Sequence, residues 1–191
     1  LDRRHLTGDK LGPLAGVPVI IKESINVAGL PSTAGWGGLS KESGGIEFIP
    51  QIDAVVVQRL RDAGALIMGK GNIPPFSASG ETANNSWAGP TYNAVNRGLI
   101  PGGSSSGVAT AVSAGFAVLG LAEETSGSIQ NPAAAQALVG VKPTFGLVPT
   151  TGAMPLSASF LDVIGPHAKS VKDAAIMLEV IAGYSHSDPN T

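Results

Sequence analysis

The sequence is most informative about the fold at Val17-Pro18-Val19-Ile20-Ile21-Lys22. A short β-branched run after Gly-Pro punctuation is typical of a buried strand. The run therefore predicts a strand over residues 17–21 that delivers Lys22 at its end. Outward from this strand, helical and extended patterns alternate along the chain, which predicts α/β layering.

The next pattern is a helix that Asp53 is placed to cap and that runs to about Ala63, where Gly64 stops it. Its expected apolar face is Val56, Val57 and Leu60. The further expected elements are a strand over 65–68, a helix over 104–114, a strand over 116–121 and a buried segment over 137–141. Long polar stretches over 29–45 and 71–103 exceed ordinary connections and predict functional loops.

The last expected helix begins at a capping box, Ser170-Val171-Lys172-Asp173, and ends at Gly183. Its apolar positions at helical spacing are Val171, Ala174, Ala175, Leu178 and Ile181. Such spacing predicts one buried helix face.

Composition indicates a soluble globular chain and excludes several classes of protein. Charged residues make up 14% of the 191 residues and the net charge is −2, so no footprint for nucleic acid or an anionic membrane is present. Apolar runs are too short to span a bilayer and no targeting segment is visible, which favours a cytoplasmic location. Cysteine is absent, so the chemistry must come from oxygen and nitrogen groups.

Two motif matches lack the context that gives each its mechanism. Residues 64–71 resemble a phosphate-binding loop, but the last position is glycine and the middle is apolar. Residues 103–107 have the letters of a nucleophile elbow without a convincing preceding strand, and only His167 is a plausible histidine for it. The three histidines, His5, His167 and His186, are interpreted as surface residues that belong to no metal site. A serine hydrolase without histidine remains, in which a buried, neutral lysine can take the proton.

Three ordered motifs together resemble the amidase signature family: GPLAGVPVIIK over 12–22, PGGSSSG over 101–107 and TSGSI over 125–129. The shorter matches are Gly69–Asn72, Gly89–Asn93, Gly140–Thr144 and Asp162–Pro166. Each match is weak alone, but the ordered set is specific. The resemblance implies a mixed, mainly parallel central sheet flanked by helices. It also implies that residues 1–191 form the N-terminal half of such a domain, with its catalytic core, and that the C-terminal half is absent.

The resemblance further implies a catalytic triad at Lys22, Ser104 and Ser128, with Ser104 held by a cis peptide bond. The two serines are 24 residues apart (128 minus 104), as the family pattern expects. Neutral Lys22 would take a proton through Ser104 while Ser128 attacks an amide carbonyl and forms an acyl-enzyme. The implied oxyanion donors are the backbone N–H groups of Thr125, Ser126, Gly127 and Ser128.

One segment departs from the family pattern. Where the family usually has Asp-Thr-Gly-Gly-Ser-Ile-Arg, residues 124–130 read ETSGSIQ. Ser126 is compatible with an oxyanion loop only if its φ is negative. Gln130 removes a cation that would pair with Glu124 or with an anionic substrate, so the sequence favours a neutral carboxamide.

The predicted function is therefore an amidohydrolase that cleaves a small neutral carboxamide without a cofactor or metal. Two alternatives stay open: a non-catalytic or incomplete homologue used for binding or assembly, and a glutaminase-type amidotransferase subunit. Taken singly, Lys22 also reads as a solvated lysine, Ser104 as a helix cap and Ser128 as a turn serine. The expected partners are the amide substrate and either the remaining segments of the same enzyme or a further copy of the chain.

Overall fold

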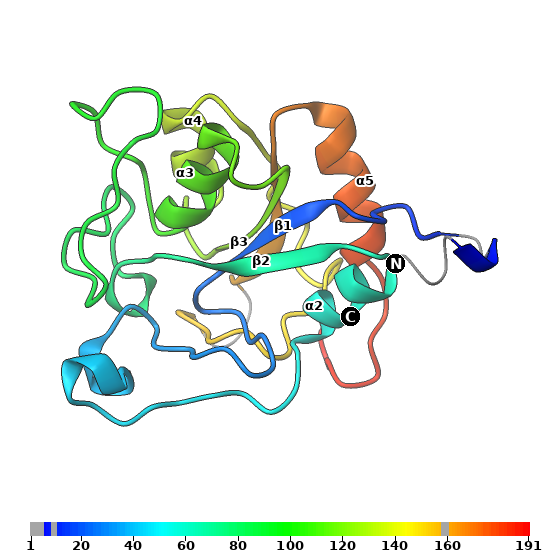
Figure 1. The fold of residues 1–191 in the computed structure, drawn as a ribbon, viewed down its shortest axis with the longest axis horizontal. Coiled ribbons are helices and arrows are strands. Elements are labelled where there is room, and N and C mark those ends of the chain that lie inside the picture. Colours follow the sequence, from blue (N-terminus) through cyan, green and yellow to red (C-terminus); the bar gives the residue numbers. More distant parts are fainter. Residues whose placement is uncertain (1–5, 9–10, 158–160) are drawn as a thin grey trace.

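The computed structural model describes residues 6–8, 11–157 and 161–191, and its centre is a five-stranded sheet (Figure 1). The strands are β1 (Pro18–Lys22), β2 (Leu66–Gly71), β3 (Leu119–Glu124), β4 (Val139–Gly140) and β5 (Val163–Ala168). Their order is β2-β1-β3-β5-β4. Strand β1 is parallel to β2 and β3, whereas β5 is antiparallel to β3 and β4. Among the described strands, only β5 therefore opposes the common direction, which confirms the mixed, mainly parallel sheet.

Helices pack on both faces of the sheet. Helices α2 (Val55–Asp62) and α5 (Val171–Ile181) contact each other and share one core with β1 and β3. Helix α3 (Ser106–Ala114) contacts β1, β2 and β3 and also α4 (Gln130–Ala135), which lies beside it in Figure 1. The two long loops contain the short 3-10 turns η1 (Gly37–Leu39), η2 (Lys41–Ser43) and η3 (Pro75–Ser77).

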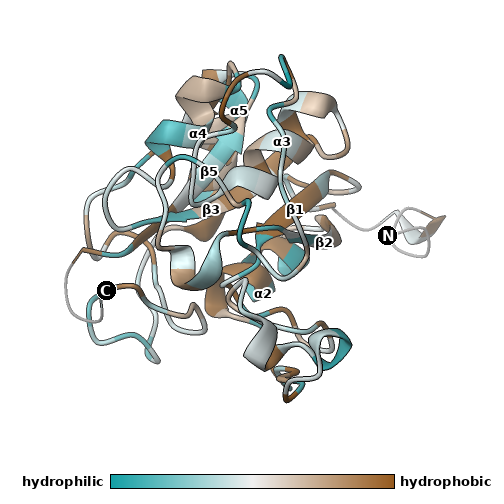
Figure 2. Ribbon diagram, turned by 90° about the vertical axis from the view of Figure 1, so that its left-hand side faces the viewer, coloured by the Kyte–Doolittle hydropathy of each residue, from teal (hydrophilic) through white to brown (hydrophobic). Residues whose placement is uncertain are grey.

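The alternation of side chains along β1 decides which residue meets which helix. Val19 and Ile21 are fully buried in the core shared with α2 and α5, whereas Ile20 packs against a second cluster that contains Val108 of α3. Figure 2 shows β1 as a hydrophobic strand between α3 and α2. Because strand side chains alternate between faces, Lys22 lies on the same face as Ile20, toward α3. The predicted strand ending at Lys22 is thus confirmed.

Asp53 does not cap α2, so this prediction is wrong. The residue before the helix is Ala54, which makes no side-chain capping bond. Instead, Asp53 Oδ1 accepts a hydrogen bond from the Ala28 N–H (2.7 Å) and Oδ2 pairs with Arg61 Nε (2.7 Å). The carboxylate joins the helix to the loop at Ala28. The predicted apolar face of Val56, Val57 and Leu60 is fully buried.

Strand β3 begins at Leu119, three residues later than predicted. The Phe116 N–H donates to the carbonyl of Ala111 (2.9 Å), so residues 115–116 complete the end of α3, and the Phe116 side chain is exposed. Helix α3 itself begins at Ser106, not at residue 104. The expected buried segment over 137–141 is reduced to the two-residue strand β4, which is only partly buried.

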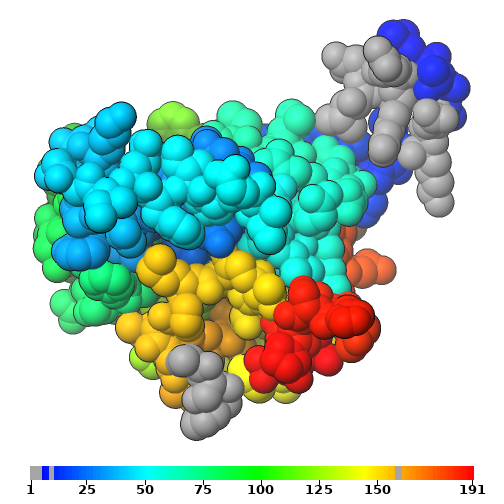
Figure 3. Space-filling model, turned by 90° about the horizontal axis from the view of Figure 1, so that it is seen from below, coloured from blue at the N-terminus to red at the C-terminus, as the bar shows by residue number. Residues whose placement is uncertain are grey.

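The capping box of α5 is confirmed, because the Ser170 hydroxyl accepts a hydrogen bond from the Asp173 N–H (3.1 Å). The buried positions of the helix are Ala174, Met177 and Ile181. Val171 and Ala175 are exposed, so the buried face is narrower than predicted and includes a methionine that the prediction omitted. After α5, residues 184–191 pack beside the segment at 149–152 (Figure 3), where Asp188 accepts from the Thr150 N–H (2.5 Å).

Candidate active site

Lys22 ends β1 inside the protein, with 1% of its surface exposed. Its Nζ donates to Ser104 Oγ (2.8 Å) and to the main-chain carbonyl of Glu123 (2.9 Å). Burial lowers the pKa of Lys22 below its ordinary value, and the nearby Glu123 carboxyl opposes this effect only in part. Burial thus makes Lys22 lose its proton more readily than an exposed lysine does, and the neutral amine is the form that can accept a proton.

Ser104 lies in a tight turn before α3 and is fully buried. The Gly103–Ser104 peptide bond is cis, as the family resemblance implied. The turn is fixed by its neighbours: the Gly103 N–H donates to the carbonyl of Gly80 (2.8 Å), and Ser106 Oγ donates to the carbonyl of Gly102 (2.6 Å). These bonds hold the Ser104 hydroxyl against Lys22.

Ser128 lies in the loop between β3 and α4, and it is 6% exposed. The backbone of Gly102 packs so closely on Pro132 that a Cβ on Gly102 would lie 2.5 Å from the Pro132 Cα. The Ser104 turn and the helix that follows Ser128 are therefore in contact. Among the described residues, however, Ser128 Oγ makes no hydrogen bond with Ser104 or Lys22.

The loop before Ser128 keeps the backbone that the sequence analysis required. Ser126 does not have a positive φ, whereas Gly127 has φ +100°, a value that favours glycine. The hydroxyl of Thr125 donates to Asp162 Oδ1, and Asp162 Oδ2 accepts from the Ser157 N–H (2.9 Å). The condition placed on Ser126 is thus met, and the loop is anchored at Thr125.

Glu124 organises the other end of this loop. Its Oε2 accepts from the Ile129 N–H (2.8 Å) and the Gln130 N–H (3.0 Å), and its Oε1 accepts from Gln130 Nε2 (2.6 Å). Burial alone would raise the pKa of Glu124, but the donors on Gln130 and Ile129 outweigh it and lower the pKa. The side-chain amide of Gln130 thus binds the carboxylate without adding a positive charge to the site.

Glu123 is the residue that the sequence analysis missed. It is 3% exposed, and its Oε2 lies 3.6 Å from Lys22 Nζ. The predicted strand ended at residue 121, which left both acidic residues in an assumed loop. The usable signal was two carboxylates directly after the apolar run Leu119–Ala122.

His167 is not a surface residue, contrary to the prediction. It lies in β5, is fully buried, and its Nε2 is 2.8 Å from the carbonyl oxygen of Ile129. Burial lowers its pKa to about 4, so the ring is neutral near pH 7. His186 is exposed as predicted, and His5 lies outside the described residues. Within the described ranges, no group of three His, Cys, Asp or Glu side chains is placed to hold a metal ion.

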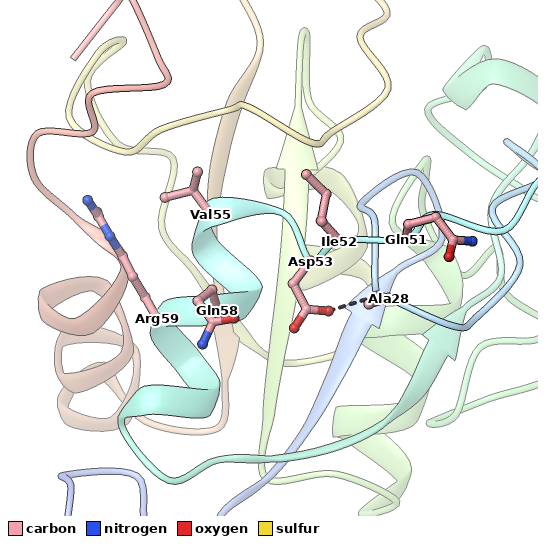
Figure 4. Close-up of a pocket in the computed structure, with 7 residues that line it drawn as sticks. All are labelled: Ala28, Gln51, Ile52, Asp53, Val55, Gln58 and Arg59. Atoms are coloured by element: carbon pink, nitrogen blue, oxygen red, sulfur yellow. Dashed lines mark hydrogen bonds between the residues drawn. The ribbon is translucent and has the colours of Figure 1, made fainter.

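Hollows also open on the surface of the described residues. One, of about 490 Å³, is formed around the start of α2 by the residues shown in Figure 4: Ala28, Gln51, Ile52, Asp53, Val55, Gln58 and Arg59. None of them belongs to the predicted triad. A second, of about 320 Å³, is lined by Glu23, which follows Lys22, and by Lys70, Leu30 and Trp87. In the part of the chain that the structure describes, no helix is long and apolar enough to cross a membrane.

Comparison with known proteins finds that the family model described as Amidase matches residues 1–191. A glutamyl-tRNA(Gln) amidotransferase subunit from Carboxydothermus hydrogenoformans is 44% identical over 188 residues, which are 98% of this chain and 37% of that protein. The corresponding subunit from Acidothermus cellulolyticus is 46% identical over 98% of the chain and 36% of its own length.

Solved structures of amidases and amidotransferase subunits are also similar to this chain. Native peptide amidase from Stenotrophomonas maltophilia matches with a TM-score of 0.88 and 41% identity, over 100% of this chain and 38% of that one. The corresponding glutamyl-tRNA(Gln) amidotransferase subunit from Thermotoga maritima matches with a TM-score of 0.86 and 39% identity, over 96% and 39%. The chain thus spans well under half the length of the relatives it matches.

Proposed function

The chain belongs to the amidase family, and from that premise we propose that it is the catalytic core of an amidohydrolase whose nucleophile is Ser128. The observation that carries the proposal is the 2.8 Å contact between Lys22 Nζ and Ser104 Oγ in the protein interior. Burial lowers the pKa of this lysine and so favours loss of its proton, which frees the lone pair that a general base needs.

The proposed acylation moves one proton in two transfers. As Ser128 Oγ forms a bond to the amide carbonyl carbon, its proton passes to Ser104 Oγ, and the Ser104 proton passes to Lys22 Nζ. The carbonyl oxygen becomes an oxyanion that backbone N–H groups of residues 125–128 stabilise. When the C–N bond breaks, the proton returns by the same route to the leaving amine and Lys22 is neutral again.

Deacylation repeats the pathway with water in place of the serine hydroxyl. Water attacks the ester carbonyl of the acyl-enzyme, and its proton passes through Ser104 to Lys22. The bond between the acyl carbon and Ser128 Oγ then breaks, and Ser128 regains the proton. The products are a carboxylic acid and a free amine, and the enzyme is restored.

The proposed substrate is a small neutral carboxamide. Gln130 supports this class, because its amide donates to Glu124 and provides no ammonium or guanidinium group for an anionic substrate. The family residue at this position is usually arginine, whose charged fork pairs with carboxylates.

A second candidate function is a glutaminase-type subunit of an amidotransferase. The 44% and 46% identity to the two amidotransferase subunits favours it. Such a subunit would use the same nucleophile on the side-chain amide of glutamine and would act with protein partners. Ammonia released from glutamine only when amidotransferase partner subunits are added would select this candidate.

A fluorophosphonate probe tests the nucleophile independently of the natural substrate. Ser128 Oγ should attack the phosphorus atom, fluoride should leave, and a covalent phosphonate ester should remain on the serine. We expect wild-type protein to be labelled and Ser128→Ala to lose the label entirely, because the variant lacks the attacking oxygen. Peptide mass spectrometry identifies the modified residue.

Ser43→Ala is the matched control, since Ser43 is an exposed serine of η2 and, among the described residues, its side chain makes no hydrogen bond with Lys22, Ser104 or Ser128. Its labelling rate should equal that of the wild type. Labelling that persists in Ser128→Ala, or a folded wild type that is never labelled, would contradict the proposed nucleophile and favour the non-catalytic alternative.

A further inference from the structure

Glu123 approaches the proposed base, Lys22, with two of its oxygens, although it takes no part in the proton transfers through Ser104. Its main-chain carbonyl accepts a hydrogen bond from Lys22 Nζ (2.9 Å), and its carboxyl Oε2 lies 3.6 Å from the same nitrogen. With Ser104 Oγ at 2.8 Å, these atoms place three oxygens around Nζ. The amine nitrogen has three directions besides its bond to Cε, so each oxygen can take one of them.

We propose that Glu123 is a positioning residue for Lys22, an inference that rests on the proposed function. A neutral amine has two N–H bonds and one lone pair. The carbonyl of Glu123 can only accept, so it takes one N–H at 2.9 Å, and the carboxylate, 3.6 Å away, attracts the other electrostatically. In the neutral amine the 2.8 Å contact with Ser104 Oγ reverses its direction, so that the Ser104 hydroxyl donates to the lone pair, as the proton transfer of the mechanism requires.

The same carboxylate also stabilises the product of that transfer. When Lys22 takes the proton it becomes an ammonium ion in the protein interior, where an isolated charge is costly. A carboxylate 3.6 Å away offsets much of this cost, because opposite charges attract strongly at low dielectric. Glu123 would therefore strengthen Lys22 as a base as well as orient it.

Glu123 is itself held in place by two serines. Ser24 Oγ donates to Glu123 Oε2 (2.5 Å), and Ser105 Oγ donates to the Glu123 carbonyl (3.2 Å). Ser24 follows β1 and Ser105 immediately follows Ser104. The position of the glutamate is thus coupled to both members of the Lys22–Ser104 contact.

Other ionisable groups near Lys22 act on it more weakly. Asp162 and Glu124 attract its ammonium form less than Glu123 does, and His167 is neutral near pH 7 because burial lowers its pKa to about 4. Burial raises the pKa of Glu123, and the charge of Lys22 opposes that rise. Removing the Glu123 carboxylate therefore removes the largest electrostatic contribution that keeps a proton on Lys22.

The test compares Glu123→Gln, Glu123→Asp and wild type by the rate of Ser128 labelling between pH 5 and 10. Without the carboxylate, the pKa of Lys22 falls further. The labelling rate rises with pH as Lys22 loses its proton, and the midpoint of this rise should therefore shift to a pH about one to three units lower. Its plateau should fall about tenfold or more, because the base is weaker and less well oriented. Glu123→Asp keeps the charge and should keep the midpoint near the wild-type value.

Two further measurements separate the possible causes. The pKa of Lys22 is read directly from the ¹³Cε shift of labelled lysine, and it should fall in Glu123→Gln with or without a substrate. Glu179→Gln, at an exposed position of α5, is the control and should change neither the plateau nor the midpoint.

The outcomes decide between the two proposals. A lower plateau with an unmoved midpoint and an unchanged Lys22 pKa would reduce Glu123 to a structural role and overturn the inference, while the proposed function stands. A folded wild type that is not labelled at Ser128 would overturn the proposed function and, with it, the role of Glu123 in catalysis.

Discussion

Two lysines on neighbouring parallel strands contact the same kinds of side chain, a serine and a carboxylate, but differ in how the rest of the protein encloses them. Lys70 of β2 is in register with the residue before Lys22 of β1. Like Lys22, it meets a serine hydroxyl, Ser32 Oγ at 2.5 Å, and a carboxylate, Glu23 Oε1 at 4.0 Å. The lysine–serine–carboxylate combination thus occurs twice at the same edge of the sheet.

The difference lies in what surrounds each combination. Lys22 is enclosed, and the turn that holds its serine packs on the helix that follows Ser128. Lys70 also donates to the carbonyl of Pro31 (3.0 Å) and lines the hollow of about 320 Å³ beside Trp87. A buried lysine beside a serine is therefore not enough to indicate a proton relay; the neighbouring nucleophile loop is the distinguishing feature.

The largest expected effect comes from replacing each lysine by methionine, which has a similar length and no charge. Lys22→Met should slow Ser128 labelling and amide hydrolysis by about 10²- to 10⁴-fold, because the general base is lost. Lys70→Met should change both rates by less than about threefold, since no proton transfer is assigned to it. Labelling kinetics of the two purified variants measure the contrast.

Folding must be checked in the same experiment. Lys22→Met leaves the buried Glu123 carboxyl without its charged partner, so the variant should unfold below the wild-type temperature, and labelling is compared under conditions in which both variants remain folded. Equal loss of labelling in Lys22→Met and Lys70→Met would contradict the assignment of proton transfer to Lys22 alone. Full activity of Lys22→Met would contradict the role of Lys22 as the general base.

A smaller contrast is expected between the two serines. Ser104→Ala removes the intermediate proton carrier, and labelling should fall about 10- to 100-fold if water occupies the vacated space and relays less efficiently. Ser32→Ala removes a hydroxyl that donates to Asn26 Oδ1 (3.2 Å), so it should lower the free energy of unfolding by about 1 kcal/mol with little change in rate. Denaturant titration and labelling kinetics together give both quantities. Equal labelling rates in the two variants would count against a relay through Ser104.

The sequence allowed prediction of the parts of this fold that depend on local pattern. The β-branched run before Lys22 and the capping box at Ser170 each determine their own element, and both are present. Boundaries were less predictable, because the end of α3 depends on a hydrogen bond from Phe116 and the start of β3 on pairing with β5. Asp53 satisfied the local rule for a cap but is held by distant partners instead.

The candidate site shows the same limit. Lys22, Ser104 and Ser128 were placed from ordered motifs, and the contact between the first two joins residues 82 positions apart that no local rule brings together. Glu123 was missed because its strand was predicted to end too early. Burial, which changes the pKa values of Lys22 and Glu123, is a property of the packed protein and not of either residue alone.

The smallest expected effect concerns stability and tests the burial of the Lys70 side chain, which is 7% exposed. Burial lowers the pKa of Lys70 from 10.5 to about 8 in the folded protein, against the attraction of Glu23. Between these values the unfolded chain keeps the Lys70 proton and the folded chain has lost it. Because the unfolded state then binds more protons, the free energy of unfolding should rise with pH in this window.

Lys70→Met removes this contribution, so the stability difference between wild type and variant should grow in favour of wild type by about 1 to 2 kcal/mol between about pH 8 and 9.5. Urea titrations at several pH values measure it, with Lys172→Met, at an exposed position of α5, as the control. The Lys22 contribution has the same sign but is present in both proteins and cancels. A stability difference that does not change with pH would mean that Lys70 is exposed to solvent. Lys70 would then share with Lys22 the kinds of side chain that it contacts, but not its burial.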